Sequence, residues 1–223
     1  MKIKAAIFDM DGTLINSLIY WDLFWAHIGE KFLGDKTFKP TDKDDKAIRT
    51  LTMNMAMQLI HDNYNIASTQ ELVDEANKMI IDFYSNTVEL KAGVKEFLEY
   101  CKAQGVKMCI ASATEPQFIK LALDRCGISE YFLKVFSCSD IGKGKDQPDI
   151  FFEAMEFLGE DIKNTYMFED SIVAIETATK IGLPTVAVYD SHCYSQDRMK
   201  EIATEYIAEG ETLTKLIYKS AQD

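Results

Sequence analysis

An alternation of short apolar runs with helical segments is the feature that most constrains the fold of this chain. Runs rich in β-forming residues lie at 4–9, 107–112, 134–139, 164–170 and 184–190. The segments between them, such as GVKEFLEYCKAQG and EPQFIKLALDRCG, have the helical period. Almost continuously apolar strands joined by crossover helices predict an α/β protein, in which a parallel sheet is covered by helices on both faces. Ligands of such sheets gather at the carboxyl ends of the strands.

The alternation stops between residues 16 and 88. This interval predicts three or four helices, at about 17–33, 43–63 and 69–86, with a polar break at GDKTFKPTDKDDK. We expect a helical domain of residues 16–88, inserted after the first strand of a core domain formed by residues 1–15 and 89–223. The alternative is a separate helical domain with an unrelated task, which the sheet elements on both sides disfavour.

Composition and charge limit the class of protein. With 223 residues, of which 47% are hydrophobic, the chain can bury a large core as a globular protein. A net charge of -12 argues against nucleic acid or an anionic membrane as partner, because both attract clustered Lys and Arg. No apolar run approaches the roughly 18 residues that span a bilayer, and the start MKIKAAIFDMDG lacks the features of a signal peptide. We therefore expect a cytoplasmic protein.

The cysteines indicate a reduced protein. They are scattered without a C-x-x-C pair, at Cys101, Cys109, Cys126, Cys138 and Cys193. An odd number suits free thiols better than a disulfide framework. We expect all five to fill the core.

Two aspartates follow the first apolar run, in KAAIFDMDGT. Residues i and i+2 of an extended chain face the same way, so Asp9 and Asp11 would project into one space, and Gly12 would permit a sharp turn beyond them. Two such carboxylates repel unless a cation neutralises them or one holds a proton. The four residues Asp-Met-Asp-Gly taken alone favour a simple turn, and it is their position at a strand end, together with the other strand ends, that favours a site.

Three other strand ends carry polar residues. Glu169 and Asp170 end the run TYMFED, where their oxygens could complete a Mg²⁺ site with Asp9, although acids also favour helix starts. Ser112 and the backbone N–H groups after it precede a helix, a geometry that cradles an anion, although Ser112 could simply cap that helix. Lys145 in GKGKDQPDIF could offset the charge of a phosphate, although a loop lysine is usually a surface residue.

Four motifs in order resemble one family. They are FDMDGT at 8–13, IASA at 110–113, KDQP at 145–148 and FEDS at 168–171. The chain resembles the haloacid dehalogenase superfamily over essentially its whole length, in the branch of phosphatases and β-phosphoglucomutases whose helical cap follows the first strand. The resemblance implies a Rossmann-like parallel sheet with an inserted all-helical cap domain.

The resemblance also implies roles for the residues at the strand ends. Asp9 would be the nucleophile that forms an aspartyl-phosphate, and Asp11 the general acid and base. The Mg²⁺ cofactor would be held by Asp9, the Asp11 backbone carbonyl, Glu169 and Asp170. The phosphoryl oxygens would be gripped by Ser112, the Ala113 backbone N–H and Lys145.

The lysine of the third motif is open to two assignments. Lys143 lies two residues before Lys145 in the same loop, and the family has proline directly after its lysine where this chain has Asp146. Pro148 and the DIF segment after it favour Lys145.

The function implied is Mg²⁺-dependent phosphatase activity on a small phosphorylated metabolite, such as a sugar or polyol phosphate, by a monomer or weak homo-oligomer. The alternative is an isomerase of the β-phosphoglucomutase kind. Mutases of the family carry a histidine in the first cap helix where this chain has Trp21, which favours water as the phosphoryl acceptor. Trp21, Phe24 and Trp25 could form a wall over the leaving group or simply pack the cap. A non-catalytic phospholigand-binding module is disfavoured because the whole set of catalytic residue types is present.

Overall fold

The structure is a computed structural model that describes residues 3–48, 51, 53–193 and 195–220. It divides into two compact units. The core unit comprises Met1–Ser17 and Val88–Asp223, and the helical unit comprises Leu18–Thr87.

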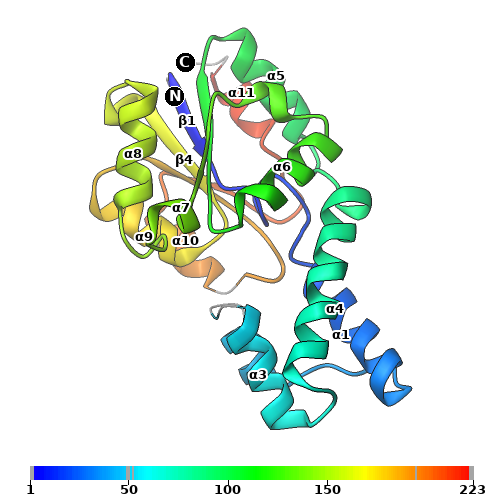
Figure 1. Cartoon of the computed structure of the whole chain (residues 1–223). Coiled ribbons are helices and arrows are strands. Elements are labelled where there is room, and N and C mark those ends of the chain that lie inside the picture. The colour runs from blue at the N-terminus through cyan, green and yellow to red at the C-terminus, as the bar shows by residue number, and fades with distance from the viewer. Residues whose placement is uncertain (1–2, 49–50, 52, 194, 221–223) are drawn as a thin grey trace. The chain divides into compact units, whose positions relative to one another are not determined.

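The core unit is built on a six-stranded parallel sheet (Figure 1). Its strands are β1 (Ala5–Phe8), β2 (Lys107–Ser112), β3 (Val135–Ser137), β4 (Thr165–Glu169), β5 (Thr185–Val188) and β6 (Glu205–Ile207). Their order in the sheet is β3-β2-β1-β4-β5-β6. The five strands expected from the sequence are confirmed; β2 has the expected bounds and the other four are shorter. The sequence did not predict β6, because three residues are too few to show a period.

The expected strand at 134–139 ends earlier than predicted. Residues Cys138–Ile141 form the short helix α7 instead. The Ser137 hydroxyl accepts a hydrogen bond from the Ser139 N–H at 3.2 Å, which caps the start of this helix and ends the strand.

Helices cover both faces of the sheet, as predicted for the α/β class. One face packs against α8 (Asp149–Leu158), α9 (Ile172–Lys180) and α10 (Gln196–Ile202). Alternate strand residues such as Ile7, Cys109 and Met167 point into this layer. The helices α5 (Val94–Ala103), α6 (Pro116–Arg125) and α11 (Lys215–Ser220) lie on the other side (Figure 1). Short 3-10 turns at Ser129–Tyr131 (η3) and Ile162–Asn164 (η4) complete the core unit.

Aromatic rings fill the layer beneath α5. The rings of Phe8 and Phe168 stack with their centroids 4.4 Å apart, directly before the acidic residues Asp9 and Glu169. Phe97 of α5 packs against both, at 6.3 Å from Phe8 and 5.4 Å from Phe168. These contacts fix α5 to the centre of the sheet, at the level of the strand ends.

We expect Phe97→Ala to destabilise the core unit by about 3–5 kcal/mol, because the side chain is fully buried and its removal leaves a cavity between rings that cannot close. The matched control is Phe152→Ala on α8. Phe152 is 49% exposed, and its truncation should change the free energy of unfolding by about 0.5 kcal/mol or less. Urea unfolding followed by circular dichroism measures both, and equal losses would contradict the assignment of Phe97 to the core.

In its described residues, the helical unit has four α-helices and two π-helical turns. They are α1 (Tyr20–Ile28), η1 (Gly29–Leu33), α2 (Asp42–Ile48), α3 (Met53–Tyr64), α4 (Thr69–Asp82) and η2 (Phe83–Thr87). The single helix expected at 43–63 is wrong, because Leu51 lies in a bend between α2 and α3; residues 49, 50 and 52 are outside the described part of the chain. The bend lets α2 pack against α3.

Two of the three aromatic residues singled out in the first helix form the interior of the helical unit. Phe24 and Trp25 are buried, and the Trp25 indole N–H donates to Asp45 Oδ1 at 3.1 Å. Packing is therefore the observed role of these two side chains. Trp21 is half-buried and stacks on Trp25, with a centroid distance of 5.6 Å.

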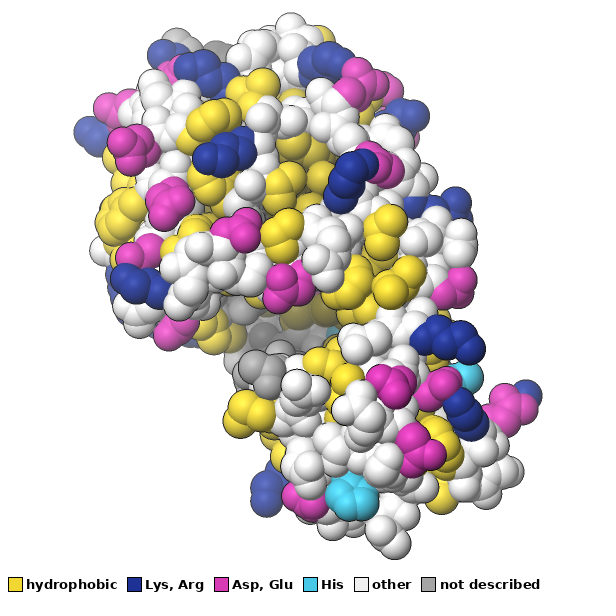
Figure 2. Space-filling model, in the orientation of Figure 1, with side chains coloured by type: hydrophobic (Ala, Val, Ile, Leu, Met, Phe, Trp, Pro, Cys, Tyr) yellow, Lys and Arg dark blue, Asp and Glu magenta, His cyan; other side chains and the backbone are white. Residues whose placement is uncertain are grey.

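The surface carries charges of both signs. On the face shown in Figure 2, Lys and Arg side chains are interspersed with Asp and Glu and do not gather into a basic patch. Within the described ranges, no helix combines the length and the apolar character needed to cross a bilayer.

Candidate active site

The strand order brings the carboxyl ends of β2, β1 and β4 side by side. β1 lies between β2 and β4, and Phe8 at its end pairs in register with Ile110 and with Phe168. Asp9 therefore leaves the sheet between the ends of β2 and β4, and its N–H donates to the Phe168 carbonyl at 2.9 Å. This is the position where parallel α/β sheets bind ligands.

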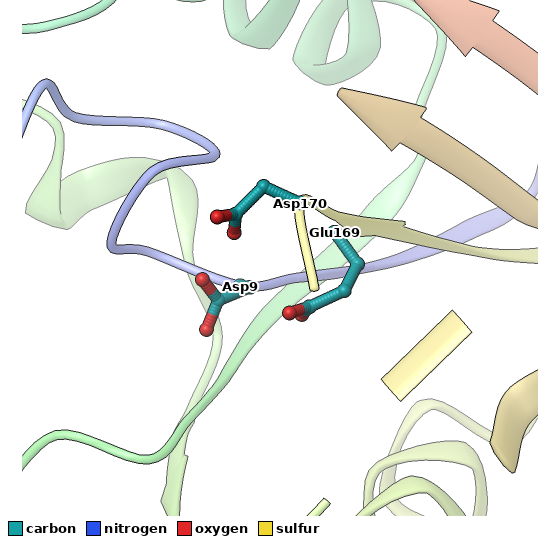
Figure 3. A group of neighbouring side chains, drawn as sticks. All are labelled: Asp9, Glu169 and Asp170. Carbon is teal, nitrogen blue, oxygen red and sulfur yellow. The ribbon is translucent and has the colours of Figure 1, made fainter. Parts of the chain in front are cut away.

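Three carboxylates converge at this edge (Figure 3). Asp9 comes from the end of β1, while Glu169 and Asp170 come from the end of β4. Each offers an oxygen, and these oxygens lie within 4.8 Å of one another. All three residues are at most 5% exposed, so the interpretation of Glu169 and Asp170 as solvated helix-start acids is wrong.

Lys145 is the cation in this cluster. Its ammonium group donates to Asp9 Oδ1 and, at 2.8 Å, to Glu169 Oε2. Its side chain is only 10% exposed, so it is not a surface lysine. Lys143 instead pairs with Asp149 at 2.5 Å, with its own side chain 54% exposed. The structure thus brings Lys145, and not Lys143, to the carboxylates.

The cluster has three buried carboxyl groups and one ammonium group, which pairs with two of them, Asp9 and Glu169. Burial and then the neighbouring charge of Glu169 raise the pKa of Asp9 to about 8, against the opposing effect of Lys145. Burial also raises the pKa values of Glu169 and Asp170 to about 7. Burial alone would lower the pKa of Lys145, but the charges of Asp9 and Glu169 outweigh it and raise the pKa.

These residues fit a divalent metal ion. With all four groups charged, the cluster has an excess of two negative charges, which one divalent cation would neutralise. Carboxylate oxygens are the ligands that Mg²⁺ prefers. Burial disfavours the charged forms of these carboxyl groups and so raises their pKa values, and a bound cation would offset that effect.

The Asp170 carboxylate is held by two further side chains. Thr13 Oγ1 donates to Asp170 Oδ1 at 3.0 Å, and the Cys193 thiol donates to Oδ2. Hydrogen bonds of this kind fix the orientation of a carboxylate. All five cysteines are free thiols, as predicted, but the expectation that Cys193 only fills the core is wrong.

Asp11 lies beside the cluster without joining it. Gly12, with a φ of +73°, turns the chain after Asp11, and the Gly12 N–H donates to the Ile15 carbonyl at 3.1 Å. The half-exposed Asp11 side chain accepts a hydrogen bond from Thr114 at 2.6 Å. Its charge still raises the pKa of Asp9, after the larger effects of burial and Glu169, so the two aspartates interact as their spacing predicts.

Ser112 and Ala113 lie at the end of β2, on the side of β1 opposite to β4. Ser112 is buried, and its hydroxyl accepts from the Thr114 N–H at 3.2 Å. It does not cap α6, whose N-cap residue is Glu115. Ala113 is exposed in the bend that follows.

The family model of haloacid dehalogenase-like hydrolases matches residues 6–188, which include the acid cluster, Lys145 and the whole helical unit. The chain belongs to the haloacid dehalogenase-like hydrolases. The family resemblance seen in the four motifs is thereby confirmed.

Several known proteins are similar to this hydrolase. Hexitol phosphatase B of Escherichia coli K12 is 28% identical over 77% of each chain. The β-phosphoglucomutase of Bacillus subtilis is 26% identical over 83% of each chain. Among solved structures, that of a candidate β-phosphoglucomutase from Thermotoga maritima superposes with a TM-score of 0.80 at 22% identity, over 97% of this chain and 99% of that one. This last likeness concerns the fold.

Three contacts in this haloacid dehalogenase-like hydrolase were not anticipated from the sequence. Thr13 is the last residue of FDMDGT, and Thr114 directly follows IASA. Their closeness to the motif residues could have indicated that both lie at the site. Cys193 lies in a segment without a recognisable motif, and nothing in the sequence pointed to Asp170 as its partner.

Proposed function

We propose that this hydrolase is a Mg²⁺-dependent phosphatase that releases phosphate from a small phosphorylated metabolite, such as a sugar or polyol phosphate. The observation that carries the proposal is the convergence of Asp9, Glu169 and Asp170 with Lys145 at the carboxyl edge of the sheet. The names of the relatives support the substrate class, since one is a hexitol phosphatase and another is a β-phosphoglucomutase.

In the first step, an oxygen of the Asp9 carboxylate attacks the phosphorus atom. The phosphorus–oxygen bond to the metabolite breaks, and an aspartyl-phosphate forms on Asp9. Asp11, protonated at this stage, gives its proton to the leaving alkoxide. The spacing of the two aspartates supports this division of roles, because both lie after β1 and only Asp9 belongs to the buried carboxylate cluster.

In the second step, water attacks the phosphorus atom of the aspartyl-phosphate. Asp11, now ionised, accepts the proton of the water, and the bond between phosphorus and the Asp9 oxygen breaks. Inorganic phosphate leaves, Asp9 is restored as a carboxylate, and Asp11 is protonated again. The half-exposed position of Asp11 supports this role, since the residue must exchange a proton in each step.

Charge neutralisation is shared between the metal ion and the protein. Asp9, Glu169, Asp170 and the Asp11 backbone carbonyl would hold Mg²⁺, which supplies positive charge that lets an anionic carboxylate and an anionic ester approach each other. Lys145, the Ser112 hydroxyl and the Ala113 backbone N–H would bind the phosphoryl oxygens. A buried ammonium group beside Asp9 is suited to this role, because it lies next to the carboxylate that attacks the phosphorus atom.

The test is a screen of hexose and hexitol phosphates for release of inorganic phosphate. We expect turnover of at least one ester with Mg²⁺, complete loss after chelation with EDTA, and recovery when Mg²⁺ is added back. An enzyme that retains full activity after chelation would contradict the metal assignment. Failure to release phosphate from any ester of the screen, with Mg²⁺ present, would contradict the proposal itself.

An isomerase of the β-phosphoglucomutase kind is the second candidate, favoured by similarity to the Bacillus subtilis enzyme. In that case the phosphoryl group of Asp9 would pass to a bound sugar and not to water. β-Glucose 1-phosphate distinguishes the two functions. Stoichiometric conversion to the 6-phosphate without free phosphate would establish the isomerase, whereas release of inorganic phosphate would establish the phosphatase.

A further inference from the structure

Thr114 is fixed at three points in the bend between β2 and α6. Its backbone N–H donates to Ser112 Oγ at 3.2 Å, and its carbonyl accepts from Ser137 Oγ at 2.8 Å. Its hydroxyl donates to Asp11 Oδ2 at 2.6 Å. The backbone of Thr114 is thus tied to the sheet, while its side chain reaches the Asp11 carboxylate.

The anchor of this bend is the end of β3. Ser137 is fully buried, and its Cα pairs in register with that of Ser112. The Ser137 hydroxyl also accepts from the Ser139 N–H at the start of α7. The Thr114 backbone is therefore held by the ends of two neighbouring strands, in a position from which its hydroxyl reaches Asp11.

We propose that Thr114 is the positioning residue for the general acid and base Asp11. This inference rests on the proposed function. A carboxyl group on a half-exposed side chain can rotate, yet proton transfer requires its oxygen within about 2.6–3.2 Å of the accepting atom. A donor fixed on Oδ2 sets the plane of the Asp11 carboxyl group, and so also the direction in which Oδ1 points.

A threonine suits both protonation states of Asp11. The hydroxyl can donate to a carboxylate and, after rotation, accept from a carboxylic acid. The bond to the ionised form is of the strong, charge-assisted kind. The β-branch of threonine restricts χ1, which keeps the hydroxyl directed at Asp11. Thr114 can therefore hold Asp11 through both halves of the reaction.

The experiment compares Thr114→Val and Thr114→Ser on two esters. For an alkyl phosphate, whose leaving group needs a proton, we expect Thr114→Val to lower kcat/KM by about 10- to 100-fold, the loss of one hydrogen bond to a charged group. For 2,4-dinitrophenyl phosphate, whose leaving group needs none, kcat/KM should fall by less than about 3-fold. Thr114→Ser, which restores the hydroxyl, should recover most of the activity on the alkyl ester.

The control is Thr179→Val on α9. The Thr179 hydroxyl donates to the Ile175 carbonyl of the same helix at 2.7 Å, so this variant should leave kcat/KM unchanged on both esters. If Thr114→Val lowered kcat/KM equally on the two esters, or lowered it on neither, the inference would be overturned. Crystal structures of the wild type and Thr114→Val supply a readout without turnover, and an unchanged Asp11 carboxyl orientation would also overturn it. A wild-type enzyme that hydrolyses neither of these esters nor any ester of the screen would refute the proposed function, while the structures would still decide the role of Thr114.

Discussion

Asp9→Asn is expected to abolish turnover, with a loss of about 10⁴-fold or more in kcat, because the amide cannot serve as the nucleophile. The variant should still fold. It removes one negative charge from a buried cluster in which carboxylates outnumber ammonium groups, so the metal-free protein should be at least as stable as the wild type. Phosphate release and thermal unfolding measure the two effects.

The matched control for Asp9→Asn is Asp11→Asn, an identical chemical change two residues away. Asp11→Asn keeps the nucleophile but lacks the base for the second step. With an activated ester whose leaving group needs no proton, it should accumulate a protein heavier by one phosphoryl group in mass spectrometry, and Asp9→Asn should not. A phosphorylated Asp9→Asn protein, or unchanged turnover in it, would refute the covalent mechanism.

Lys145→Ala is expected to lower kcat/KM by about 10²–10³-fold, the effect of removing one fixed charge that stabilises the transferring phosphoryl group. The ammonium group lies within hydrogen-bond distance of Asp9 and Glu169, so its loss also leaves these two buried carboxylates without their cation. Steady-state kinetics on the ester found in the screen, at saturating Mg²⁺, measures the change.

Lys143→Ala is the matched control for Lys145→Ala. Its ammonium group pairs with Asp149 on the surface, and an exposed pair of this kind contributes little to stability. We expect Lys143→Ala to keep kcat/KM within about 2-fold of the wild-type value. Comparable losses in the two variants would mean that both lysines of the loop contact the substrate.

The sequence predicted the architecture of the core because burial on both faces of a parallel sheet requires nearly continuous apolar strands. Apolar runs such as KMCIAS therefore predicted the strands directly, and the acidic and hydroxyl residues at their ends indicated where the strands stop. Short or boundary elements were missed. β6 has only three residues, and the bend at Leu51 interrupts a segment whose period alone indicates one helix.

The contacts around the carboxylates depend on tertiary packing, which short sequence patterns do not predict. The choice between Lys143 and Lys145 was open in the sequence, where the two lysines differ by two positions in one loop. In the structure one is buried against Asp9 and the other is paired at the surface. The path of the loop decides which of the two side chains points inward, and the spacing of two residues does not determine that path.

By itself, the sequence determined the α/β class, the family, and the strand ends that carry the acidic residues and Ser112, because each is encoded within a few consecutive positions. Only the tertiary structure decided which side chains support them. Thr114 meets Asp11 across 103 positions of the chain, and Cys193 reaches Asp170 from beyond the next strand. Such pairs form because the sheet order places separate strand ends side by side, and that order is a property of the packed core as a whole.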